Sequence, residues 1–239
     1  MKKVFLLVLF VTGALFVNAQ GSNWQFSVGT SLPSGDFKDT NRNFNLEKGD
    51  GFAAVGLTIG LKYIQPLAAV EGLSWTVGAD IYFNPLNSDY KEEIEDMIDE
   101  LEEYCDEVGY TLPRYFNVPL TVGLNYQYNV NANTAIFAEL GLGYNLSKMT
   151  NQKFWMEYDG DEENMTLKLD LSTAFCYRLE AGVLFNQKYS LSLKYNALGS
   201  HKYKGEIAWE DNDDDGSDKY KYDKALNITT IGLTFGIRF

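Results

Sequence analysis

The alternation of the last fifteen residues, 225–239, constrains the fold more than any other feature of the chain. One set of positions is mainly apolar and ends on Phe239, whereas the interleaved set is small or polar and includes Gly232, Gly236 and Arg238. Side chains on a strand point alternately to its two faces, so this segment predicts a strand with one apolar face. Strands of soluble sheets are about half as long. A strand of this length that ends on a lipid-facing aromatic residue is typical of the closing strand of a transmembrane β-barrel.

Seven further segments alternate in the same way, and their apolar faces agree with one another. They cover residues 23–32, 51–63, 72–84, 115–128, 134–146, 166–185 and 189–198. Short links at 64–71, 129–133 and 186–188 alternate with longer, more acidic ones. This pattern predicts an all-β fold: an eight-stranded antiparallel transmembrane barrel with short periplasmic turns and long extracellular loops. A soluble lipocalin-like barrel is the alternative, but it would place its large apolar side chains inside.

The beginning of the chain predicts export. Lys2 and Lys3 precede an apolar run over residues 4–16, and Val17-Asn18-Ala19 is a plausible cleavage site. We therefore expect a signal peptide over residues 1–19 and the barrel over residues 20–239, located in a bacterial outer membrane. No other apolar run is long enough for a transmembrane helix.

Charge and cysteine content narrow the function. The chain has 33 acidic and 20 basic residues, a balance that excludes nucleic acid as a partner, because a phosphate backbone requires a basic face. Cys105 and Cys176 are the two cysteines, and in an oxidising compartment they are either paired or free. Sixteen Tyr and fifteen Phe match the aromatic girdles of membrane barrels.

Three short stretches resemble the outer-membrane β-barrel domain family, which includes PorT-like and porin-family proteins. They are Gly236-Ile237-Arg238-Phe239, the run Tyr115-Phe116-Asn117-Val118-Pro119-Leu120, and the junction Ala19–Gln20. The resemblance implies export and barrel assembly, with Phe235, Ile237 and Phe239 as the signal read by the barrel-assembly machinery and outer-membrane lipid as the surroundings. Members of the family differ in role, so it implies little about mechanism.

Charged residues recur on the face that we expect to line the lumen: Lys62, Asp80, Glu139, Arg178, Glu180, Lys194 and Arg238. Eight strands leave an interior just wide enough for side chains to fill, and isolated buried charges are costly. The set therefore predicts a salt-bridged plug, with a gated ion path as the alternative. If Phe185 pairs with Tyr189 across the turn at 186–188, Glu180 lies opposite Lys194 and Arg178 lies opposite Asn196.

Residues 88–109 predict an amphipathic helix inside the loop between the third and fourth strands. An apolar stripe at helical spacing consists of Ile94, Met97, Ile98, Leu101, Tyr104, Cys105 and Val108. Asp89 with Glu92 resembles a capping box, and Gly109 stands where the helix should end. The stripe must rest either on the barrel rim and its loops or on a partner protein, for which Ile94, Met97, Ile98, Leu101, Tyr104 and Val108 would be the partner-facing set.

Catalytic and metal-binding signals are few. His201 is the only histidine, and its neighbour Ser200 should point to the opposite face of a strand, so the two cannot form a catalytic pair there. Asp211, Asp213 and Asp215 before Gly216 resemble half of a calcium loop, but Tyr222 stands where the bidentate Glu is needed. We expect a solvated acidic loop with at most weak Ca²⁺ binding, and no other cofactor.

These observations predict a small outer-membrane protein that is not an enzyme. We expect a structural or protein-interaction component, such as an accessory subunit of a secretion or assembly complex. A small channel or porin for ions or small solutes is the alternative, and a lipid-modifying enzyme is a distant third.

Overall fold

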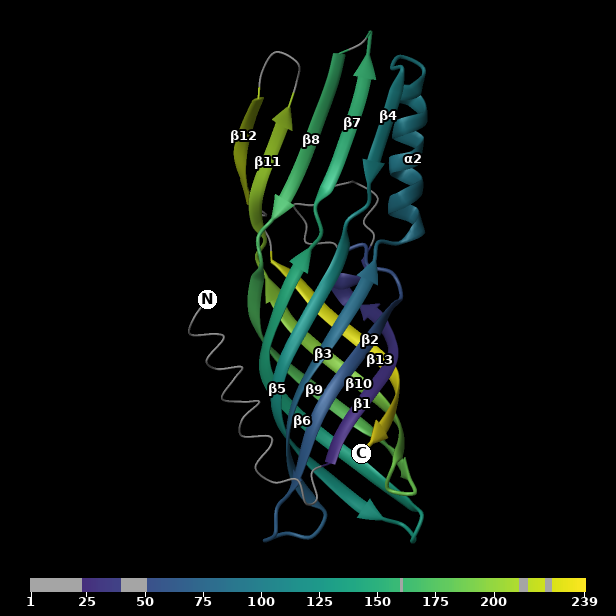
Figure 1. Ribbon diagram of the computed structural model, residues 1–239, viewed down its shortest axis with the longest axis vertical. Helices are drawn as coiled ribbons and strands as arrows, with labels where there is room; N and C mark the ends of the chain where they lie inside the picture. The colour runs from purple at the N-terminus through teal and green to yellow at the C-terminus, as the bar shows by residue number, and fades with distance from the viewer. Residues whose placement is uncertain (1–22, 40–50, 160, 211–214, 222–224) are drawn as a thin grey trace.

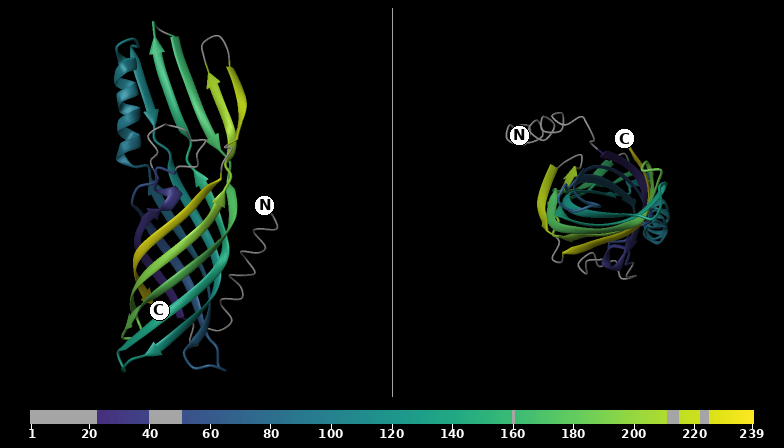
Figure 2. Two further views of the ribbon diagram at one scale, coloured as in Figure 1. Left: turned by 180° about the vertical axis from the view of Figure 1, so that it is seen from behind. Right: turned by 90° about the horizontal axis from the view of Figure 1, so that it is seen from below.

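The computed structural model describes residues 23–39, 51–159, 161–210, 215–221 and 225–239. Eight strands form a closed antiparallel barrel in the order β1-β13-β10-β9-β6-β5-β3-β2 (Figure 1). Their bounds are β1 Asn23–Ser34, β2 Gly56–Pro66, β3 Leu73–Pro85, β5 Arg114–Asn129, β6 Thr134–Met149, β9 Ser172–Phe185, β10 Tyr189–His201 and β13 Leu226–Arg238. The view along the barrel shows the closed ring (Figure 2). The predicted fold class is confirmed.

The two faces of the barrel wall follow the predicted alternation. On β13, for example, Leu233 and Phe235 are exposed, whereas Thr230 and Thr234 are buried in the lumen. The exposed apolar face of all eight strands is what a lipid-facing wall requires, and the lumen face is small or polar. The last strand pairs with the first, Val28 lying opposite Phe235, so the sheet has no open edge in the wall.

Two of the predicted strands differ clearly from the structure, whereas the ends of the others agree within three residues. The second strand begins at Gly56 rather than at residue 51, and Ala53, expected on the lipid face, is buried and bridges to Leu86. The predicted strand over 166–185 is two strands, β8 Asp161–Leu169 and β9, because Asp170 and Leu171 leave the strand conformation and interrupt it. Alternation alone does not reveal this break.

A second sheet stands above the barrel, where the sequence predicts long loops. Its strands are β4 Glu107–Thr111, β7 Gln152–Tyr158, β8, β11 Lys204–Glu210 and β12 Asp215–Lys221, in the order β12-β11-β8-β7-β4. We call this sheet with its helix, α2 Ser88–Glu102, the extension. The barrel strands continue upward into it, and α2 stands beside β4 (Figure 1).

The helix is shorter than predicted and is capped differently. It ends at Glu102, and Val108 belongs to β4, so the predicted stop at Gly109 is wrong. Asn87 is the N-cap: its side chain accepts a hydrogen bond from the backbone N–H of Tyr90. The Asp89 and Glu92 capping box is therefore also wrong. In the described part of the chain no helix is long and apolar enough to cross a membrane.

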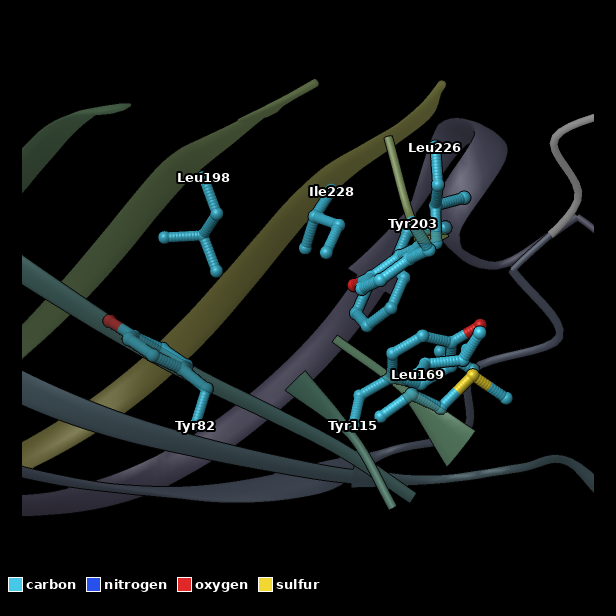
Figure 3. Close-up of a cluster of buried hydrophobic side chains, with 10 residues drawn as sticks. Tyr82, Tyr115, Leu169, Leu198, Tyr203, Leu226 and Ile228 are labelled. Atoms are coloured by element: carbon cyan, nitrogen blue, oxygen red, sulfur yellow. The ribbon is translucent and has the colours of Figure 1, made fainter. Parts of the chain in front are cut away.

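An apolar cluster fills the mouth of the barrel at the end next to the extension. It comprises Phe37 of the short 3-10 helix η1 (Gly35–Phe37), with Ala53, Tyr82, Tyr115, Met149, Leu169, Leu198, Tyr203, Leu226 and Ile228. We call it the mouth cluster. Several of its side chains converge across the end of the barrel from opposite strands (Figure 3). The core therefore lies at the junction between the barrel and the extension.

Candidate functional site: the lumen and the extension

Six of the seven predicted lumen charges form one connected network. Lys62 Nζ donates to Glu139 at 2.7 Å and to Glu180 at 3.0 Å. Arg178 donates to Glu139 and, at 2.6 Å, to Asp80. Lys194 donates to Asp80 at 3.0 Å. The chain Glu180–Lys62–Glu139–Arg178–Asp80–Lys194 thus crosses the lumen and carries three positive and three negative charges, which cancel.

The network depends on a glycine opposite one of its members. Gly60 pairs with Asp80 across β2 and β3, and a Cβ on Gly60 would lie 2.1 Å from Asp80 Oδ1. The missing side chain leaves the space that the carboxylate occupies. Glu139 and Glu180 are direct cross-strand neighbours on β6 and β9, so two like charges face each other. Lys62 contacts both and offsets their repulsion.

The predicted register is confirmed, but the predicted ion pair is not. Glu180 lies opposite Lys194 and Arg178 opposite Asn196, as the turn at 186–188 implies. Glu180 nevertheless accepts from Lys62 and from Ser192 Oγ, whereas Lys194 binds Asp80. In a narrow barrel, a long side chain reaches across the lumen as readily as it reaches its strand neighbour.

Arg238 lies outside this network. It is buried near the other end of the barrel, where it donates to Gln25 and Gln127 and lies over the ring of Phe137. Arg238 thus faces the lumen as predicted, but it forms none of the ion pairs found among the described residues. Phe235 and Phe239 are exposed on the wall, and Ile237 is partly exposed beside them. Their role as an assembly signal stays a prediction.

Buried polar side chains lie beside the residues of the mouth cluster. His201 is fully buried there, with Nε2 3.0 Å from the carbonyl of Leu198 and Nδ1 3.2 Å from Ser172 Oγ. Ser200 is exposed on the opposite side of the strand, as predicted. Ser147 and Tyr203 share a hydrogen bond of 2.6 Å, and burial raises the pKa of Tyr203, so its hydroxyl stays neutral inside the mouth.

The lumen is therefore closed at two levels. A hollow beside the charge network, between Asp80, Arg178 and Asn196, has no room for a water molecule. Above it the mouth cluster places apolar side chains across the end of the barrel that faces the extension (Figure 3). Side chains therefore occupy the lumen at both levels.

The stripe of α2 packs on the chain's own extension. Ile94 and Ile98 are buried against Phe52, Val108, Tyr110 and Phe154 in one cluster. Burial raises the pKa of Tyr90 in the same cluster, whose hydroxyl accepts from Gln152. The prediction that Ile94, Ile98 and Val108 face a partner is wrong. Met97 and Tyr104 are exposed, Leu101 is half-buried, and Tyr104 lies beyond the end of the helix.

The extension sheet has an inner face that continues the lumen face of the barrel strands. Cross-strand pairs place Phe154 beside Met165, Met165 beside Trp209, and Leu167 beside Ile207. Leu169, two residues beyond Leu167 on β8, joins the mouth cluster, which fixes this face as the inner one. Sequence reasoning misses this face because its short, polar segments resemble loops.

The inner face is only partly covered. α2 packs over its β4 and β7 side, whereas Met165 is 51% exposed and Trp209 is 37% exposed at the other side. Phe154, Met156, Met165 and Trp209 line a hollow of about 280 Å³ together with Glu163, Asn164 and Glu210. This side of the inner face thus exposes methionine and tryptophan side chains, and glutamate side chains border them.

The predicted calcium-binding residues lie only partly within the described residues, whereas both cysteines lie within them. Asp211 and Asp213 lie outside the described residues, and Asp215 begins β12, so weak Ca²⁺ binding stays a prediction. In the residues that the structure describes, no group of three or more His, Cys, Asp and Glu is suited to a metal. Cys105 in the extension and Cys176 in the lumen are both free.

These features define a class: a small eight-stranded barrel of the outer-membrane type, with an ordered extension at one end. No family model and no curated protein matches the chain. The PorT-like resemblance therefore stays a prediction, as does the signal peptide, which lies outside the described residues.

Solved outer-membrane proteins are similar to the chain in structure. A major outer membrane protein of Thermus thermophilus is 10% identical with a TM-score of 0.51, the match covering 92% of this chain and 100% of that one. Neisserial surface protein A is 10% identical with a TM-score of 0.47, covering 92% and 98%. OprG of Pseudomonas aeruginosa is 15% identical with a TM-score of 0.44, covering 92% and 96%. At such identities the Thermus match supports the fold and nothing finer.

Proposed function

We propose that this chain is a non-conducting outer-membrane protein that holds its extension outside the cell as a protein-binding platform. The outer-membrane location is supported by the apolar side chains exposed on the outside of the barrel and by the fold of the chain. The absence of an open path is supported by the neutral ion network and the mouth cluster. Both favour a structural or interaction component over a small channel.

The half-exposed inner face of the extension is the observation that carries the platform role. Exposed apolar patches with polar borders are typical of protein-interaction sites, and methionine adapts to varied partners. Met165 and Trp209 are exposed beside Glu163 and Glu210, so the patch suits a partner with apolar and basic side chains. The role of accessory subunit in a secretion or assembly complex is one form of this proposal.

Site-specific photo-crosslinking in native membranes tests the platform. A photoreactive residue replaces Met165 on the inner face or, as the matched control on the neighbouring strand, Lys153 on the outer face. We expect discrete protein adducts from position 165 and none of the same mass from position 153. Identical adducts from both positions, or none from position 165, would overturn the role of the inner face.

A further inference from the structure

Basic residues on the outside of the molecule gather where the barrel meets the extension. The exposed ones in the described chain near this junction are Lys38, Arg114, Lys148, Lys153, Lys168, Lys202, Lys204 and Lys219. We call them the basic collar. They stand just after η1, at the ends of barrel strands β5, β6 and β10, and on the lower parts of β7, β8, β11 and β12 (Figure 1). The chain has a net charge of −13, so a group of basic residues at one level of its surface is unexpected.

Acidic residues are most frequent farther from the barrel, although Asp170 and Glu206 lie among the collar lysines. The far ends of the extension strands carry Glu157, Asp161, Glu162, Glu163 and Glu210, which we call the acidic crown, and α2 is acidic along its solvent side. The exterior thus changes along the barrel axis from the apolar wall to the mainly basic collar and then to the acidic crown. An anionic surface at the collar would attract the collar and repel the crown.

Three of the collar lysines share a hollow. Lys168, Lys204 and Lys219, with Asp170, Glu206 and Ser217, line a depression of about 770 Å³ on the outer face of β8, β11 and β12. Glu206 lies between Lys168 and Lys219 in the cross-strand register. None of the three lysines takes part in the ion pairs found among the described residues. The hollow thus combines three ammonium groups with two carboxylates and carries a net positive charge of one.

The collar lies directly above the apolar wall. On β9 and just before it, Leu171 and Phe175 face outward below Lys168, and Leu171 is 57% exposed. On β6 and β5, Lys148 is the cross-strand neighbour of the exposed Phe116. A lysine next to lipid-facing aromatic residues is at the level of lipid headgroups, where its stem contacts apolar surface and its charge reaches polar groups.

We propose that the basic collar binds the phosphate groups of anionic lipids in the outer leaflet. This inference rests on the proposed location in the outer membrane. Lipid phosphates lie at the height of the collar and carry the complementary charge, and juxtamembrane lysines are attracted to such surfaces. The collar thereby sets the depth of the barrel and keeps the acidic crown clear of the headgroups.

The test compares lipid capture by the folded, full-length chain in bilayer nanodiscs. Nanodiscs of mixed phosphatidylcholine and diphosphorylated lipid A are analysed by native mass spectrometry for lipid that remains bound after release of the chain. The variant is Lys168→Gln and Lys219→Gln together. The matched control, with the same change of net charge, is Lys91→Gln and Lys188→Gln, both of which are exposed outside the collar.

We expect the wild-type chain and the control to retain diphosphorylated lipid A. The collar variant should retain at least tenfold less of this lipid than the control. Each lysine near an anionic surface contributes on the order of fivefold in affinity. Equal retention by the collar variant and the control would overturn the inference. So would displacement of the lipid by free inorganic pyrophosphate, which would identify a soluble phosphate as the ligand. If the wild-type chain does not enter bilayers at all, the proposed location fails instead.

Discussion

Asp80 is the residue on which the lumen network depends most. It is buried and accepts from both Arg178 and Lys194, so its loss leaves Lys194 with no ionic partner among the described residues. Removing one partner of a buried ion pair costs about 3–5 kcal/mol, because the other charge stays in a medium that solvates it poorly. The network should therefore behave as a unit rather than as separate pairs.

A double-mutant cycle distinguishes the observed pairs from the pairs implied by strand register. Asp80→Asn and Lys194→Gln should each lower the free energy of unfolding, with a coupling of at least about 1 kcal/mol. Urea unfolding in detergent measures the two single variants and the double variant. The coupling between Glu180→Gln and Lys194→Gln should be smaller, although these two residues are direct strand neighbours. The reverse order would show that Lys194 binds Glu180.

Gly60 offers a second test at this scale. Gly60→Ala would place a Cβ 2.1 Å from Asp80 Oδ1, so we expect a loss of about 1–3 kcal/mol in the free energy of unfolding from displacement of the carboxylate. Gly141→Ala is the matched control, since its Cβ would have no neighbour closer than 3.5 Å. Equal effects at the two glycines, measured by urea unfolding, would contradict the packing of Asp80.

At the scale of elements, α2 is a cover for the extension rather than a free arm. Its buried side chains Ile94 and Ile98 share one apolar cluster with Phe154 and Val108, which come from two different strands. The helix therefore depends on the sheet, as most protein helices depend on tertiary packing.

Ile98→Asp should release the helix, because a carboxylate cannot be buried against Phe154 without large cost. Hydrogen exchange over residues 88–102 should become faster, while exchange in the barrel strands stays unchanged. Met97→Asp, on the exposed side of the same turn, is the control and should leave the exchange rates as in the wild-type chain. Faster exchange throughout the barrel in Ile98→Asp would mean that α2 supports the barrel itself.

Sequence periodicity locates the barrel well and the extension poorly. The barrel strands are long and strictly alternating, so residues such as Lys62 and Glu139 can be placed in the lumen from the sequence alone. The extension strands are short and polar, and β7 has the partly buried Trp155 and Met156 next to each other on opposite faces. Neither face of β7 has a clear apolar pattern, so its sequence resembles that of a loop.

The predicted helix boundary is wrong for a related reason. Val108 fits the apolar spacing of α2, but the fit is accidental, since Val108 lies on β4 after a turn. The choice of ionic partners inside the lumen is not predictable from the sequence either. Strand register places Lys194 opposite Glu180, but the length of the lysine side chain and the position of Asp80 across the barrel decide the contact.

At the scale of the whole molecule, closure of the barrel depends on β13. This strand pairs with β10 on one side and with β1 on the other. Without it both neighbours would present unpaired backbone groups to lipid, which cannot satisfy them. The mouth cluster would also lose Leu226 and Ile228.

Deletion of residues 226–239 should abolish assembly and the compact, heat-modifiable band of the folded barrel on gels. Deletion of residues 67–70, in the exposed link between β2 and β3, is the control and should leave the band in place. A heat-modifiable band from the β13 deletion would show that the barrel closes through other strands.

The closed lumen is the central claim, and electrical conductance across a planar bilayer tests it most directly. The folded chain is inserted at neutral pH, with insertion verified by protease protection and with a large porin as the positive control for the bilayer. Because the ion network and the mouth cluster both fill the path, we predict no steady current above that of the bare bilayer. A steady current proportional to voltage in the wild-type chain would contradict the account.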